Sequence, residues 1–182
     1  LSCKDSLEKL REQIVEFRPR LVCVECSNHA RQLRESFDRQ QFIPQIEFLW
    51  GLEGLKQISE DSEIDLVVAG IVGAIGLEST FAAVEAGKTV AIANKEPLVM
   101  AGELFIKTAK KTGSKLLPID SEHNAIFQAL HNEHKDNIAR LVLTASGGPF
   151  RDLPLNDFEK INLADSLKHP NWKMGEKISI DS

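Results

Sequence analysis

A chain of 182 residues with 42% hydrophobic and 27% charged residues has the composition of a folded protein, with room for one large domain or for one domain and part of another. Its net charge of -5 at pH 7 argues against nucleic acid or an anionic membrane as the main partner. No apolar run approaches the roughly 20 residues that cross a bilayer, and no basic-then-apolar stretch of signal-peptide type follows Leu1.

Helical and strand-like patterns alternate along most of the chain. In chain order, the spacing of apolar residues predicts a helix over 7–17, a strand over 21–24, a helix over 30–37, a strand over 45–49, a helix over 52–58, a strand over 65–69, a helix over 77–86, a strand over 89–92, a helix over 97–111, a strand over 115–119, a helix over 124–130 and a strand over 140–143. After Pro149 short polar segments predominate, as is typical of loops over a site, and residues 178–180 again resemble a strand. This alternation indicates an α/β fold with a doubly wound, Rossmann-like parallel sheet.

A domain boundary is expected near Pro118. Residues 1–119 would form the Rossmann-like domain, and residues 120–182 would begin a second α/β domain that carries the chemistry. The chain starts at Leu1 rather than Met and a helical pattern follows almost at once, so we expect an internal piece of a longer protein.

Three cysteines, an odd number, indicate free thiols in a reducing compartment. Cys23 and Cys26 have the C-x-x-C spacing of redox and metal sites. However, residues 21–24 have the pattern of a buried strand, in which cysteine acts as a small hydrophobe, and no second pair completes a zinc site. We therefore interpret both cysteines as structural.

Two carboxylates, Asp120 and Glu122, follow the strand expected at 115–119. In an extended segment, residues i and i+2 point to the same side, so both carboxylates can converge on one Mg²⁺ or Mn²⁺ ion. Ligands of α/β sheets bind outside the carboxyl ends of the strands, which is where this pair would lie. The alternative is a helix N-terminus, because Asp and Ser are good caps and Glu favours the first turn. The spacing alone leaves both interpretations open.

Two further strand ends carry polar or glycine-rich turns. Gly70, Gly73 and Gly76 follow the strand at 65–69 without the dinucleotide spacing G-x-G-x-x-G, so the turn either lets the backbone approach a ligand or is an ordinary strand-to-helix connection. Asn94 and Lys95 follow the strand at 89–92 and present an amide and a cation at its carboxyl end.

Two later segments complete the set of candidates. Residues 146–149 can form a nest for a phosphate or an ordinary glycine turn. Residues 169–175 combine an imidazole, an indole and a lysine in a polar setting, and an exposed tryptophan there would suit closure over a ligand.

Taken together, six stretches closely resemble the 1-deoxy-D-xylulose 5-phosphate reductoisomerase family of the non-mevalonate isoprenoid pathway. They occur in the family's order and extend over most of the chain: residues 70–77, 93–96, 117–128, 146–151, 169–172 and 177–182. The stretches 120–128 and 169–172 are the most specific of them.

The resemblance implies an enzyme that depends on NADPH and on Mg²⁺ or Mn²⁺. Such an enzyme rearranges 1-deoxy-D-xylulose 5-phosphate and reduces the resulting aldehyde to 2-C-methyl-D-erythritol 4-phosphate. Residues 1–119 would then bind NADPH, and residues 120–182 would bind metal and substrate. The implied metal ligands are Asp120 and Glu122, and the implied substrate contacts near the ion are Lys95, Ser121 and Glu122.

The resemblance also assigns the remaining site residues. Ser146, His169 and Ser182 would bind the substrate, with the two serines directed at its phosphate. The implied catalytic residues are Lys95, Asp120, Glu122 and His169. The implied NADPH contacts are Asn94, Glu96 and Gly175, and Trp172 and Met174 would belong to a flap that excludes water.

Some expected parts of the family lie outside these residues. The glycine-rich nucleotide fingerprint would precede Leu1 and the third metal carboxylate would follow Ser182, so the 182 residues alone are expected to be inactive. We also expect a homodimer in the complete protein, without a nucleic-acid or membrane partner, in a bacterial cytoplasm or a plastid stroma.

Two alternative functions are kept. One is another Rossmann-type NAD(P) oxidoreductase such as homoserine dehydrogenase, which also has Ala-Asn-Lys after a strand but has no use for the acidic pair at Asp120 and Glu122. The other is a catalytically incomplete fragment that only binds a nucleotide or phosphate ligand.

Overall fold

The computed structural model describes residues 1–38, 46–144, 147–171 and 175–181. The chain divides into two compact units, Leu1–Asp120 and Ser121–Ser182, a division one residue beyond the expected boundary. Within the described ranges, no helix is both long enough and apolar enough to cross a membrane.

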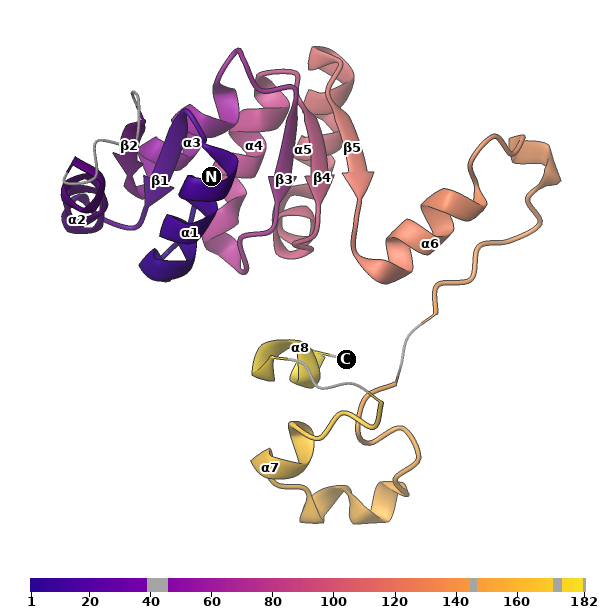
Figure 1. Ribbon diagram of the computed structural model, residues 1–182. Coiled ribbons are helices and arrows are strands. Elements are labelled where there is room, and N and C mark those ends of the chain that lie inside the picture. Colours follow the sequence, from indigo (N-terminus) through magenta and orange to yellow (C-terminus); the bar gives the residue numbers. More distant parts are fainter. Residues whose placement is uncertain (39–45, 145–146, 172–174, 182) are drawn as a thin grey trace. The chain divides into compact units, whose positions relative to one another are not determined.

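The first unit alternates helices and strands in the expected order (Figure 1). Its elements are α1 (Leu7–Phe17), β1 (Leu21–Val24), α2 (Ser27–Asp38), β2 (Glu47–Trp50), α3 (Gly51–Glu60), β3 (Leu66–Ala69), the short 3-10 helix η1 (Ala74–Gly76), α4 (Leu77–Glu85), β4 (Thr89–Ile92), α5 (Glu96–Thr112) and β5 (Lys115–Pro118). The periodicity of the sequence thus predicts the order of these elements correctly, because each strand is a short, largely apolar run and each helix presents an apolar stripe.

All strand pairings in the described residues are parallel. β1 pairs with β2, and β3, β4 and β5 form a second group with β4 in the middle. Ser2 adds an isolated parallel bridge to Cys23 on β1. Parallel strands joined by helical crossovers confirm the doubly wound α/β fold.

Each strand group has its own apolar core. In the first, side chains of α1 and α2 cover β1, whose four residues are all buried. In the second, α4 and α5 cover β4, and the fully buried Phe105 meets Phe81 edge-on at 5.2 Å between ring centroids. Strands that are buried in this way read as continuous aliphatic runs rather than alternating ones, which is why they were recognisable in the sequence.

Cys23 lies within the first core. Its side chain is completely buried, and this burial raises the pKa of the thiol to about 11. Its Sγ makes weak hydrogen bonds of 3.7 Å to the Val24 carbonyl oxygen and 3.6 Å to the Gly51 carbonyl oxygen. At neutral pH the group is therefore a protonated thiol, and it packs as a small hydrophobe.

The described residues of the second unit form helices and turns. These are α6 (Ser121–Ala129), η2 (Lys135–Asn137), η3 (Leu155–Lys160), α7 (Leu163–Ser166) and α8 (Glu176–Asp181). Figure 1 draws both units, whose placement relative to one another is not determined.

Two strands expected in the second unit are wrong. Residues 140–143 carry a strand-like apolar run, but no described segment pairs with them and Leu141, Val142 and Leu143 are about 60% exposed. Residues 178–180 lie in α8, where Ser179 donates from both its N–H and its hydroxyl to the Gly175 carbonyl oxygen. An apolar run becomes a strand only when a neighbouring backbone completes its hydrogen bonds, and the pattern of the run does not supply that neighbour.

Gly54 of α3 should be sensitive to substitution. A Cβ at this position would lie 2.9 Å from Cys23 Sγ and 2.9 Å from Leu49 Cβ. We expect Gly54→Ala to lower the free energy of unfolding by about 1–3 kcal/mol, because overpacking outweighs the roughly 1 kcal/mol by which alanine favours a helix.

Gly102 of α5 is the matched control, because a Cβ there would meet nothing closer than Leu98 Cβ at 4.0 Å. We expect Gly102→Ala to leave stability unchanged or higher. Urea unfolding of both variants measures the difference, and equal stabilities would show that α3 does not approach β1 as closely as described.

Candidate active site

The turns that follow β3, β4 and β5 lie at one edge of the sheet. The register pairs Ala69 with Ile92 and Ile92 with Pro118, so the three strands end level with one another. The alignment continues past the strand ends, because the Ala93 N–H donates to the Ala69 carbonyl oxygen at 3.1 Å and the Ile119 N–H donates to the Ile92 carbonyl oxygen at 3.0 Å. In parallel α/β sheets this carboxyl edge is where ligands bind.

The turn after β3 depends on two of its glycines. Gly73 has a φ of +81°, which favours glycine, and a Cβ on Gly76 would lie 2.8 Å from the Ile71 carbonyl oxygen. The Thr80 hydroxyl donates to the Gly76 carbonyl oxygen at 2.6 Å and fixes the end of the turn on α4. The glycines therefore allow a close backbone turn, whereas Val72 and Ile75 on the same segment are more than 60% exposed.

The turn after β4 contains Asn94, Lys95 and Glu96. The side chain of Asn94 is only 7% exposed, and its amide nitrogen donates to the carbonyl oxygens of Ile71 and Gly73. Its Oδ1 accepts a hydrogen bond of 3.2 Å from the Glu96 N–H at the start of α5. The turns after β3 and β4 are thus joined by one side chain.

Lys95 and Asp120 bring opposite charges together at this edge. Lys95 Nζ lies 3.9 Å from Asp120 Oδ2, and the Asp120 side chain is 14% exposed. The two residues come from the turns after β4 and β5, which are neighbouring strands. A carboxylate offers hard oxygen atoms, the ligands that Mg²⁺ and Mn²⁺ prefer.

The acidic pair does not have the extended geometry that its spacing suggested. α6 begins at Ser121 and Glu122 lies in its first turn, so the expectation of an extended segment is wrong. The physical reason is that Asp, Ser and Glu favour a helix N-terminus, which is the alternative interpretation of this spacing. Asp120 ends the first unit and Glu122 belongs to the second, so convergence of both on one ion stays a prediction. The described residues contain no cluster of three His, Cys, Asp or Glu side chains.

The other candidate residues belong to the second unit. Ser121 is exposed at the start of α6, and Gly175 is exposed before α8. His169 is half-buried after α7, and its Nδ1 accepts a hydrogen bond of 3.2 Å from the Asn171 N–H. The remaining candidates lie outside the described residues: Ser146, Trp172, Met174 and Ser182.

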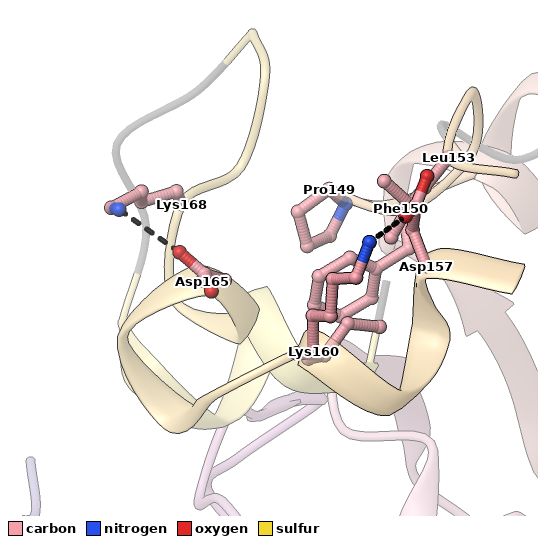
Figure 2. Close-up of a pocket in the computed structure, with 8 residues that line it drawn as sticks. Pro149, Phe150, Leu153, Asp157, Lys160, Asp165 and Lys168 are labelled. Atoms are coloured by element: carbon pink, nitrogen blue, oxygen red, sulfur yellow. Dashed lines mark hydrogen bonds and ion pairs between the residues drawn. The ribbon is translucent and has the colours of Figure 1, made fainter.

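The second unit also contains a cavity that the sequence did not indicate (Figure 2). It has a volume of about 450 Å³, and Pro149, Phe150 and Leu153 contribute apolar walls. Two ion pairs flank it, Lys160 with Asp157 at 2.6 Å and Lys168 with Asp165 at 3.1 Å. Among the candidate site residues that the structure describes, none lines it.

Models of one protein family match most of the chain. A family model described as 1-deoxy-D-xylulose 5-phosphate reductoisomerase matches residues 1–102, and a model of the C-terminal domain of the same enzyme matches residues 116–182. The whole chain is 48% identical to the 1-deoxy-D-xylulose 5-phosphate reductoisomerase of Geobacter metallireducens and 49% identical to that of Shouchella clausii. It covers 46% and 47% of those two proteins, so it spans about half the length of these curated relatives.

Solved structures give the same result. A crystal structure of DOX-P reductoisomerase in complex with NADPH, fosmidomycin and magnesium matches with a TM-score of 0.84 and 44% identity, and 1-deoxy-D-xylulose 5-phosphate reductoisomerase from Zymomonas mobilis in complex with NADPH matches with a TM-score of 0.85 and 34% identity. Each match covers all of this chain, and 46% and 45% of the respective solved chains.

The parallel strands, the helical crossovers and the turns at the carboxyl edge define an α/β protein of Rossmann-like architecture. Within that class, the chain belongs to the 1-deoxy-D-xylulose 5-phosphate reductoisomerase family.

The short helix α7, which precedes His169, provides a pH test of the second unit. Lys168 Nζ donates to Asp165 at 3.1 Å and the Asn162 N–H donates to the same carboxylate at 3.3 Å, and both bonds hold the pKa of Asp165 below its usual range. Because the pKa is lower in the folded state, the two bonds contribute fully to the stability of the folded state above the ordinary value of about 3.9. This stabilisation is lost as the pH falls through the lower folded value.

We expect an NMR titration to give Asp165 a pKa below about 3.9, and Lys168→Met to raise it. Lys160→Met is the matched control, because it removes an equivalent i, i+3 pair with Asp157 and should leave Asp165 unchanged. An Asp165 pKa at or above the ordinary value would contradict the two hydrogen bonds described for its carboxylate.

Proposed function

We propose that the protein carrying this chain is an NADPH-dependent and metal-dependent 1-deoxy-D-xylulose 5-phosphate reductoisomerase. The observation that carries the proposal is the approach of Lys95 Nζ to Asp120 Oδ2, 3.9 Å apart at the carboxyl edge of the sheet. Membership of the reductoisomerase family and the likeness to a complex with NADPH, fosmidomycin and magnesium support it. The product would be 2-C-methyl-D-erythritol 4-phosphate.

The metal would be held by Asp120 and Glu122, with further ligands from outside this chain. Carboxylate oxygens suit Mg²⁺ or Mn²⁺, and the largely buried Asp120 carboxylate offers such an oxygen. When bound, the ion polarises substrate oxygens and offsets the negative charge that develops on them. The donor chemistry of the two residues therefore fits the ion.

Lys95 would act on the substrate beside the metal ligands. Its side chain is 56% exposed, so the ammonium group is accessible to a bound molecule while Asp120 stays close to it. An ammonium fixed in this position stabilises an anionic oxygen during rearrangement of the carbon skeleton. The same charge would then favour an alkoxide oxygen when hydride reaches the aldehyde carbon.

The cofactor would bind across the turns after β3 and β4. The glycine turn at 70–76 brings backbone close to the edge, and Glu96 begins α5 beside it. The N–H groups of the first turn of a helix favour negative charge, as a nucleotide phosphate carries. We propose Asn94, Glu96 and Gly175 as residues of the NADPH site.

The second unit would supply most of the substrate site. Ser121, Ser146, His169 and Ser182 would bind the sugar phosphate, with Ser146 and Ser182 at its phosphate group. His169 would orient a substrate oxygen through its imidazole, with Lys95, Asp120 and Glu122 as the other catalytic residues. We also propose that the complete protein is a homodimer in a bacterial cytoplasm, as the resemblance to the family implies.

A direct test uses a protein of the relatives' length that carries this chain, called the full-length protein below. We expect Asp120→Asn to lower turnover by a factor of about 100 or more, because it weakens a preorganised electrostatic contact with the substrate. The affinity for NADPH should change by less than about twofold, since the ion contacts the substrate rather than the cofactor. Oxidation of NADPH with 1-deoxy-D-xylulose 5-phosphate and limiting Mn²⁺ measures the first effect, and NADPH titration measures the second.

Asp136→Asn is the control, because its side chain is 87% exposed and lies 3.2 Å from His134 Nδ1. It should leave turnover unchanged. Near-wild-type turnover of Asp120→Asn would refute the metal assignment. NADPH binding without any turnover by the unaltered full-length protein would instead favour the binding-only alternative.

A further inference from the structure

Asn94 uses its side chain inside the protein rather than at its surface. The residue is 7% exposed, and its amide nitrogen donates to the carbonyl oxygens of Ile71 and Gly73. An asparagine amide has two N–H donors, so both are used in these bonds. Two carbonyl acceptors on one side and a backbone donor, the Glu96 N–H, on the other also fix which end of the amide is nitrogen.

These bonds connect segments that are distant in sequence. The bonds to Ile71 and Gly73 span 23 and 21 residues, and the bond to Glu96 spans two. A single side chain therefore holds the glycine turn after β3 against the start of α5. The residue between the two attachment points is Lys95, whose Nζ lies 3.9 Å from Asp120 Oδ2.

The glycine turn offers few other means of keeping its shape. A Cβ on Gly70 or Gly73 would meet nothing within 4 Å, so no neighbouring atom packs against the turn where a side chain would begin at these two positions. The turn is anchored at its far end, where the hydroxyls of Ser79 and Thr80 donate to the Gly76 carbonyl oxygen. Between Ala69 and Gly76, the two bonds from Asn94 are therefore a main constraint on the backbone.

We propose that Asn94 is a positioning residue of the NADPH site, which acts by holding the 70–76 backbone and the Lys95–Glu96 turn in one arrangement. Its amide donors are not directed at the cofactor, in contrast to the direct contact that the sequence suggested. This inference rests on the proposed NADPH-dependent function and deepens it. It assigns part of the cofactor affinity to a side chain whose amide donors make no contact with the cofactor.

The substitution Asn94→Asp isolates this role. It keeps the shape of the side chain and the acceptor for the Glu96 N–H, but it replaces both N–H donors with an oxygen facing two carbonyl oxygens. In the full-length protein without ligand, we expect amide hydrogen exchange at residues 70–76 to become at least about tenfold faster, as expected for loss of a buried hydrogen-bond pair. We also expect the Kd for NADPH to rise about tenfold or more, and that for Mn²⁺ to change less than about twofold.

The control is Asn137→Asp, the same chemical change at an exposed asparagine of η2, which should alter neither measurement. If Asn94→Asp does not fold, Asn94→Ser provides the same test, because it removes both amide donors without placing a carboxylate oxygen against the two carbonyl oxygens, and it should show a smaller increase in both quantities. A pH series gives a second signature, since a protonated aspartic acid regains one O–H donor and should slow the exchange again.

The outcomes separate the two proposals. Faster exchange at 70–76 together with weaker NADPH binding supports the positioning role. Weaker binding with unchanged exchange overturns it, because Asn94 would then be a direct ligand, and faster exchange with unchanged NADPH affinity overturns it as well. If the unaltered full-length protein binds no NADPH, the proposed function fails, while the exchange measurement still decides whether Asn94 holds the turn.

Discussion

Parallel pairing of β4 with β3 on one side and β5 on the other determines where the candidate residues of the first unit lie. Strands of one direction and one register must end together, so the turns at 70–76, 93–95 and 119–120 meet at a single edge. The buried aliphatic face of β4 fixes the pairing, because a shift of one residue would turn its side chains away from α4 and α5. The Lys95–Asp120 approach is a direct consequence of this register.

Close backbone approach is the second constraint at this edge. Gly76 comes so near to the Ile71 carbonyl oxygen that a side chain there would clash, and Gly73 adopts a φ that other residues avoid. A turn of this kind exposes polar backbone to a ligand, yet it has little packing of its own. Polar side chains from neighbouring elements, Asn94 and Thr80, hold it by hydrogen bonds instead. The edge thus combines an accessible backbone with a fixed geometry, which is the requirement for binding a nucleotide phosphate.

The sequence predicts the first unit well because its signals are local. The strands are short, largely apolar runs, and the helices between them carry regular apolar stripes, so β1 to β5 and α1 to α5 follow from spacing. The strand expected at 140–143 fails because pairing depends on a partner that the run itself does not encode. The extended form expected for Glu122 fails because capping preferences at Asp120 and Ser121 favour a helix.

The site is less predictable than the fold because its decisive contacts are distant in sequence. Lys95, Asp120 and the glycine turn are visible as polar or glycine residues after strands, a signal that sequence can supply. The burial of Asn94 and its bonds across more than 20 residues are not visible in any local pattern. The nearest signal in the sequence is an asparagine that follows a buried strand, when the neighbouring strand ends in a glycine turn. Placement of Glu122 and His169 relative to Asp120 depends on how the two units meet, which no spacing within either unit determines.

The proposed site is tested most directly by finding where the cofactor binds. Amide hydrogen exchange of the full-length protein, measured with and without NADPH, reports which backbone segments the cofactor protects. We expect protection at residues 70–76 and 93–98, at the carboxyl edge, and no change at residues 86–88 and 113–114, which precede β4 and β5 at the opposite edge. Protection at the opposite edge alone, or at neither edge despite demonstrated binding, would refute the proposed cofactor site.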